Sequence, residues 1–127
     1  MDEYPVPKEG DDPGTFKALK AIRIQFYLNS ALVQLKTNLA TDAITSCTRA
    51  LEMDGADLST QDMAKAYYRR GQAHGKANED ESAIEDLNKA LELNPGDPGI
   101  ITELNAARQR QRVRKEKLRK AYSKMFS

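Results

Sequence analysis

The fold of this 127-residue chain is decided by one stretch, Ala64-Lys65-Ala66-Tyr67-Tyr68-Arg69-Arg70-Gly71, and by the Ala83, Ala90 and Pro95 that follow it. Tyr67 stands one helical turn before Gly71, and the alanines recur where a second helix would return. Helix axes approach to about 8–10 Å only where the side chains at the contact permit it, so small residues in this pattern indicate two closely packed helices. Pro95 then ends the second helix, because proline cannot continue one. Residues 64–97 therefore predict one helical hairpin.

The same pattern occurs forty residues earlier in the chain. Tyr27 corresponds to Tyr67, while Gly55 stands where the second copy has Pro95. The smaller residues also correspond: Ala31 to Gly71, Ala43 to Ala83, and Ala50 to Ala90. Self-similarity at such a spacing is typical of solenoids, which present surfaces to partners more often than they catalyse reactions. We predict an all-α fold with two repeats, at 24–57 and 64–97.

Helix signals divide the rest of the chain. Residues 1–14 are rich in proline, glycine and acids and are expected to form a flexible leader. Ser59 and Asp62 are spaced for the N-terminal cap of a helix, and Asp97 is a candidate cap with Pro98 at the first helical position. The expected helices cover approximately residues 15–36, 40–53, 60–77, 79–93 and 98–124.

Two apolar faces are expected at the ends of the solenoid. The final helix, within a basic segment at 98–127, should cap the second repeat through the residues Ile100, Ile101, Leu104 and Ala107, while its distal half projects into solvent. At the other end, Ile22, Phe26 and Val33 of the first helix lack a preceding repeat to cover them. We therefore expect this first-repeat face to pair two copies of the chain as a homodimer.

The net charge of +1 conceals an acidic body and a basic tail. Residues 24–97 contain seven Lys/Arg and twelve Asp/Glu, whereas residues 98–127 contain nine Lys/Arg and two Glu. No apolar run approaches the about 20 residues of a membrane-spanning helix, and no aromatic set accompanies the arginines to stack nucleic acid bases. The N-terminal residues lack the composition of a signal or transit peptide, and one cysteine cannot form an internal disulfide. These features favour a cytoplasmic protein that binds neither membrane nor nucleic acid.

Catalysis, cofactors and metals find no support in the residue pattern. His74 and Cys47 are the only residues of their types, and neither has the partners that a metal site or a nucleophile–base pair requires. Both fall at repeat positions that normally pack helices, so we expect structural roles. We predict no catalytic residues, no metal ligands, no cofactor and no enzyme activity in this chain.

Polar residues one turn apart on the first helix of each repeat are the candidate binding residues. They are Lys65 and Arg69 in the second copy, and Gln25 and Asn29 in the first. An ammonium, a guanidinium and a carboxamide that converge on one groove would bind an extended acidic peptide, because Lys and Arg form charge-assisted hydrogen bonds to carboxylates. On spacing alone, Lys65 and Arg69 are equally consistent with exposed helix residues that bind nothing.

These motifs carry a family resemblance. The pattern Tyr27-Leu28-Asn29-Ser30-Ala31, with Lys65-Ala66-Tyr67-Tyr68-Arg69-Arg70, resembles the carboxylate-clamp tetratricopeptide-repeat domains. Within that group it is most similar to the C-terminal domain of the large, forty-kilodalton-class cyclophilins. The ending of this chain, Lys120-Ala121-Tyr122-Ser123-Lys124-Met125-Phe126, is similar to the ending of that domain. The resemblance implies a co-chaperone that binds the C-terminal Glu-Glu-Val-Asp tail of the 90-kDa, or the 70-kDa, heat-shock chaperone. It implies that Asn29 holds the terminal carboxylate and that Lys65 and Arg69 meet the residues just before it.

The chain departs from that family in two respects. The family domain has three repeats, and residues 1–23 show no first-repeat pattern. No cyclophilin catalytic domain is present, so the chain is expected to be a fragment or a shortened isoform of a peptidyl-prolyl isomerase, with a partial clamp. Two alternatives stay open. One is that the basic tail, with Arg112, Lys115 and Arg119 as a secondary surface, binds calmodulin or another acidic partner. The other is a self-associating repeat fragment.

Overall fold

The computed structural model describes residues 13–53 and 58–126, and every regular element in them is an α-helix. The five helices are α1 (Pro13–Lys36), α2 (Ala40–Leu51), α3 (Thr60–Lys76), α4 (Asp80–Leu93) and α5 (Pro98–Met125). The predicted all-α class is confirmed, and each expected helix is present with its ends shifted by at most two residues. The expected leader at residues 1–14 lies almost entirely outside the described residues, and α1 begins at Pro13.

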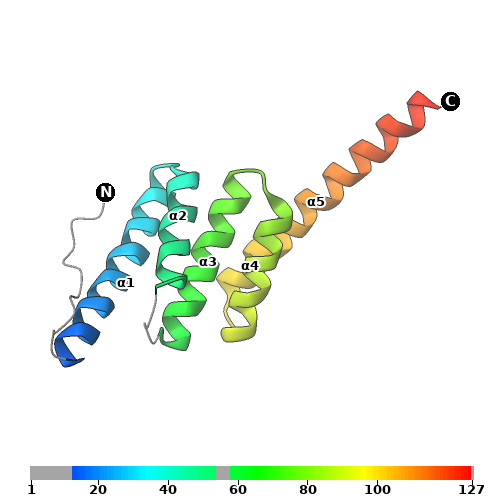
Figure 1. Ribbon diagram of the computed structural model, residues 1–127. Coiled ribbons are helices and arrows are strands. Elements are labelled where there is room, and N and C mark those ends of the chain that lie inside the picture. The colour runs from blue at the N-terminus through cyan, green and yellow to red at the C-terminus, as the bar shows by residue number, and fades with distance from the viewer. Residues whose placement is uncertain (1–12, 54–57, 127) are drawn as a thin grey trace.

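The helical hairpins follow one another in a row, in chain order (Figure 1). Each helix packs against the next, from α1 on α2 to α4 on α5, and α1 also contacts α3. This arrangement is the helical solenoid that the internal repeat predicts. Beyond its contact with α4, α5 extends away from the hairpins as a single projecting helix (Figure 1).

The helix ends follow the predicted caps. The Ser59 hydroxyl accepts a hydrogen bond from the Asp62 backbone N–H, and the Asp97 carboxylate accepts from the N–H groups of Gly99 and Ile100. Both predicted N-caps are confirmed, and each satisfies backbone donors that the helix itself leaves without a partner. The carboxylate of Asp62 does not complete a reciprocal cap, since it accepts instead from Gln25 Nε2 at 3.1 Å.

The turn within each hairpin repeats as well, and sequence reasoning missed this signal. Asn38 and Asn78, forty residues apart, both adopt positive φ, at 61° and 63°. In each turn the residue after the asparagine donates its N–H to a carbonyl five residues back, from Leu39 to Gln34 and from Glu79 to His74. This is the Schellman ending of a helix, and asparagine is one of the few non-glycine residues that tolerate it.

Helices α3 and α4 approach each other closely at Gly71. A Cβ atom on Gly71 would meet Leu87 Cγ at 2.7 Å, so glycine is the residue that fits. Leu87 itself is 1% exposed. The equivalent positions of the first repeat hold Ala31 and Cys47, both fully buried. The larger residue in one helix is thus matched by a smaller one in the other, as close packing requires.

Two packing expectations need correction. Leu104 and Ala107 are buried against α4 and Ile100 is buried as predicted, but Ile101 is 40% exposed because it is turned about 100° around α5 from Ile100. Phe26 is half-buried, because its ring packs on the Ile24–Tyr27–Leu28 cluster and meets Tyr27 edge-on. Only Ile22 and Val33 of the expected apolar face are strongly exposed, at 48% and 60%.

The contact at Gly71 predicts a matched pair of stability effects. Gly71→Ala should lower the free energy of unfolding by about 1–2 kcal/mol, because overpacking against Leu87 exceeds the gain in helix propensity. Gly75→Ala is the control, since the Cβ would meet only the flexible end of Arg110. It should leave the melting temperature unchanged or raise it. Thermal unfolding by circular dichroism measures both, and a Gly71→Ala variant as stable as Gly75→Ala would contradict the packing described.

Candidate functional site

An open hollow of about 720 Å³ lies along one side of α3. We call it the concave groove. Its walls come from α1, α3, the end of α4 and the start of α5, through the residues Leu32, Thr60, Gln61, Ala64, Lys65, Tyr68, Arg69, Gln72, Leu93, Asn94, Asp97 and Ile100. Apolar side chains form part of the surface, and its charged lining residues are Lys65 and Arg69 of α3 and Asp97 at the start of α5. Such a mixed, concave surface suits an extended peptide.

Lys65 and Arg69 both line the concave groove, one turn apart on α3. Arg69 Nη1 donates to the Leu28 carbonyl oxygen of α1 at 2.6 Å, so this side chain also ties α1 to α3. Burial lowers the pKa of the Arg69 guanidinium from its ordinary value. A guanidinium has five N–H donors, so the bond to Leu28 leaves others available for a ligand.

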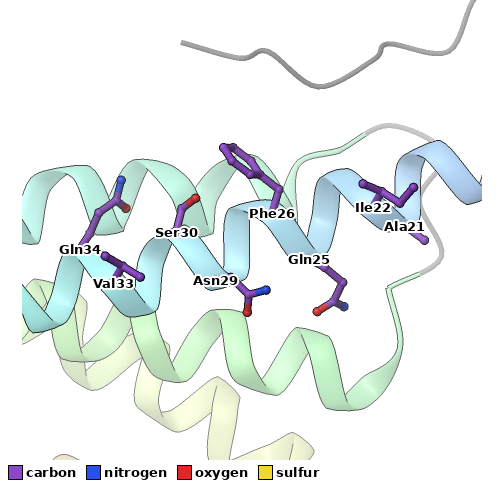
Figure 2. Close-up of a pocket in the computed structure, with 8 residues that line it drawn as sticks. All are labelled: Ala21, Ile22, Gln25, Phe26, Asn29, Ser30, Val33 and Gln34. Atoms are coloured by element: carbon purple, nitrogen blue, oxygen red, sulfur yellow. The ribbon is translucent and has the colours of Figure 1, made fainter.

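Asn29 and Gln25 lie on the side of α1 that faces α3 (Figure 2). They line a separate, shallower hollow of about 650 Å³ that follows α1 together with Ile22, Phe26 and Val33. Gln25 donates to Asp62 of α3, which places the two helices in contact at this end. The structure therefore brings Lys65 and Arg69 into one groove, with Asn29 exposed beside it on α1 rather than among its lining residues.

The side of the concave groove toward α5 carries acidic groups, a feature that sequence reasoning missed: Asp97 lines the groove, and Glu103 adjoins it through Gln72. Gln72 Nε2 donates to the Tyr68 hydroxyl and to Glu103 Oε1, each at 3.4 Å. Burial raises the pKa of Tyr68, and the nearby carboxylates of Glu103 and Asp97 raise it further. Glu103 lies six residues beyond the second repeat, which ends at residue 97, so only the packing of α5 brings it here.

A polar cluster behind the groove connects the three central helices. Arg70 forms two hydrogen bonds to Asp86, at 2.7 and 2.9 Å, and a third to Thr48 of α2. His74 Nε2 lies 3.5 Å from the same Asp86 carboxylate, and its Nδ1 lies 3.3 Å from Glu79. A bidentate arginine–carboxylate pair of this kind fixes geometry as well as charge.

The first repeat contains a neutral version of this cluster. Its Gln34 side-chain amide and Ser46 hydroxyl are hydrogen-bonded at 2.8 Å, at the positions equivalent to His74 and Asp86. Ser30 stands where the second repeat has Arg70. The forty-residue alignment therefore contained a signal for this charged pair. Arg70 and Asp86 of the second repeat stand where the first repeat has Ser30 and Ser46, so both members of the pair differ between the copies.

Cys47 is fully buried, and burial raises the pKa of its thiol to about 12. Because the thiolate is the reactive form, this cysteine is chemically inert in the folded chain. His74 is half-buried in the polar cluster described above. Across residues 13–53 and 58–126, no three side chains of the metal-binding types come together, and no helix there is long and apolar enough to cross a membrane.

The basic α5 divides into two parts with different contacts. Arg110 and Arg114 both pair with the buried carboxylate of Asp80, at 3.1 and 3.3 Å, which fixes the middle of α5 at the start of α4. The predicted surface residues Arg112, Lys115 and Arg119 are exposed, and Arg119 also pairs with Glu116. Several apolar side chains of the distal half are exposed as well, namely Val113, Leu118, Tyr122, Met125 and Phe126.

Comparison with known proteins identifies the repeat and its relatives. The tetratricopeptide-repeat family model matches residues 64–97. A Cryptococcus neoformans protein named peptidyl-prolyl cis-trans isomerase D is 34% identical over 130 residues, which cover 99% of this chain and 34% of that protein. A Kluyveromyces lactis protein of the same name is 37% identical over 111 residues, or 87% of this chain and 29% of that protein. The chain thus spans about a third of the length of these curated relatives.

A solved structure is also similar. It belongs to the UNC-45 chaperone, described as binding and folding muscle myosin, and its sequence is 30% identical to this chain. The match has a TM-score of 0.63 and covers 85% of this chain and 12% of the other. The helical-repeat arrangement of the described residues is therefore shared with a part of a chaperone.

Proposed function

Because the chain is a tetratricopeptide-repeat domain with relatives named peptidyl-prolyl cis-trans isomerase D, we propose that it binds the acidic C-terminal tail of a chaperone. The ligand is an extended peptide ending in Glu-Glu-Val-Asp, as in the 90-kDa heat-shock chaperone and the 70-kDa one. Lys65 and Arg69 contact its acidic groups, and Asn29 contacts its terminal carboxylate. The chain is an interaction module of a cytoplasmic co-chaperone and has no catalytic role of its own.

One observation carries this proposal. Lys65 and Arg69 project from adjacent turns of α3 into the same concave groove, and both are only partly buried. An open groove with cations on its central helix is suited to carboxylates on an extended chain. The relatives' names support a parent protein that carries an isomerase domain in the part that this chain does not span.

Lys65→Ala should weaken binding of a labelled Glu-Glu-Val-Asp peptide by roughly tenfold to a hundredfold, because a charge-assisted hydrogen bond contributes about 1.5–3 kcal/mol. Fluorescence anisotropy measures the affinity. Amidation of the peptide's terminal carboxylate should weaken binding too. In the Asn29→Ala variant, the peptides with a free and with an amidated C-terminus should bind with nearly the same affinity. Arg69→Ala is a less direct test, because the bond from Arg69 to Leu28 also joins α1 to α3.

The matched control is Lys76→Ala. Lys76 is an exposed lysine at the C-terminal end of α3 and does not line the concave groove. Its loss changes the net charge by the same amount and should leave peptide affinity nearly unchanged. If Lys65→Ala and Lys76→Ala bind the peptide equally, at matched melting temperatures, Lys65 has no part in recognition.

The distal half of α5 supports a second candidate function. Leu118, Tyr122 and Met125 follow at spacings of four and three, so they share one face of the helix. All three are exposed, and basic side chains including Arg112, Lys115 and Arg119 surround them. A basic helix with apolar anchors is suited to an acidic partner such as calmodulin.

Calcium dependence separates this function from the first. Calmodulin should bind the chain in calcium and release it when calcium is chelated. Leu118→Glu should abolish that binding, because it places a negative charge among the anchors of an acidic partner. Lys65→Ala should have no effect on it. Titration calorimetry measures the interaction, and binding that persists in Leu118→Glu or without calcium would exclude a calmodulin-type mode.

The exposed face of α1 supports association between copies. Ile22, Phe26, Asn29 and Val33 follow at spacings of four, three and four, the pattern of a helix–helix seam. Ile22 and Val33 are 48% and 60% exposed. We propose that two copies pair through this seam. The sequence of α1 contains no acidic residue, so like charges on the two helices oppose the pairing.

This pairing should produce dimers that increase with protein concentration and with salt, because salt screens the repulsion between two cationic helices. Analytical ultracentrifugation measures the species. Ile22→Glu should give a monomer without loss of stability, since the side chain is exposed. Val113→Glu, at an exposed apolar residue of α5, is the control and should leave the dimer intact. A monomer at all concentrations and salt levels would rule out the pairing.

A further inference from the structure

The charges of the concave groove are separated along its width. The cations Lys65 and Arg69 belong to α3, and Arg69 faces α1 through its bond to Leu28. On the α5 side, Asp97 lines the groove, and Glu103 lies next to it, bonded to the lining residue Gln72. A peptide that crosses the groove from α1 to α5 therefore meets positive charge first and negative charge afterwards.

The two carboxylates differ in what they already bind. Asp97 is committed to the start of α5, where Oδ1 accepts from the N–H groups of Gly99 and Ile100 while Oδ2 accepts from Asn94. Glu103 accepts one long bond, 3.4 Å from Gln72 Nε2. A carboxylate has about four lone-pair sites, so Glu103 keeps most of its capacity to accept hydrogen bonds.

Tyr68 positions the start of α5, the helix that carries Glu103. A Cβ atom on Gly99 would lie 3.0 Å from the Tyr68 hydroxyl oxygen, so the tyrosine tip packs directly against the first turn of α5. The same hydroxyl accepts from Gln72, which in turn donates to Glu103. This chain of contacts from α3 to α5 holds the partly exposed Glu103 carboxylate at Gln72, on the edge of the concave groove.

We propose that this edge of the groove is a specificity site, in which Glu103 selects a ligand with a hydrogen-bond donor on the N-terminal side of its acidic residues. This inference rests on the proposed function, in which the terminal carboxylate lies toward α1 and the acidic residues lie over α3. The residues before them then reach α5. A lysine, arginine or hydroxyl side chain at that point donates to Glu103, whereas a further acidic residue is repelled by Glu103 and Asp97.

The test uses the whole chain and labelled peptides that end in Glu-Glu-Val-Asp. In each peptide one of the three positions before this sequence holds either Lys or Glu, and the others hold Ala. At one position the Lys peptide should bind about three- to tenfold more tightly than its Glu counterpart, as expected for a partly exposed charge pair against a like-charge contact. Glu103→Gln should remove that preference, since the amide retains the bond to Gln72 but loses the charge.

Glu92→Gln is the matched control. It removes the same charge from an exposed residue of α4 outside the concave groove, and the preference for Lys should persist. Equal binding of Lys and Glu peptides at all three positions would overturn the specificity site alone, as would a preference that survives in Glu103→Gln. Failure of every peptide to bind, or binding indifferent to amidation of the terminal carboxylate, would overturn the proposed function and this inference with it.

Discussion

The close approach of two helices within each hairpin is the constraint on which the rest of the structure depends. In the second repeat the missing side chain of Gly71 admits Leu87, and in the first repeat Ala31 and Cys47 divide the same space differently. This contact sets how α3 lies on α4, and hence which side of α3 faces outward. Lys65, Tyr68, Arg69 and Gln72 reach the concave groove because the opposite side of α3 is held against its neighbour.

Charged pairs then fix the relative positions of helices that apolar packing alone would allow to shift. Arg70 and Asp86 join α3 to α4, and Asp80 holds α5 through Arg110 and Arg114. Breaking a buried pair by removing one partner is costly, so such pairs specify position even where they add little net stability. The orientation of α5 also brings the Glu103 carboxylate within 3.4 Å of Gln72, which lines the concave groove.

The parts of the fold that were predictable are those that follow from local rules. The forty-residue repeat, the caps at Ser59 and Asp97, and the burial of Leu104 each follow from residue type and spacing. The missed features involve residues far apart in sequence. Phe26 was expected to be exposed, yet its ring packs on a neighbouring cluster, and Arg69 was expected only to bind a ligand, yet it also bonds Leu28. Spacing within one helix cannot show which side chains from another helix will reach it.

The sequence by itself determined the helices, their pairing into two repeats and the residues that terminate them. These features follow from propensity, side-chain size and periodicity, which act over a few turns of chain. The tertiary structure alone decided which polar residues share a surface. It placed Lys65 and Arg69 in one groove, with Asn29 on the helix beside it, and it brought Glu103 of α5 to Gln72 at the edge of that groove. The physical reason is that the groove is made where α1, α3 and α5 meet, and the angles at which helices pack depend on contacts between residues distant in sequence.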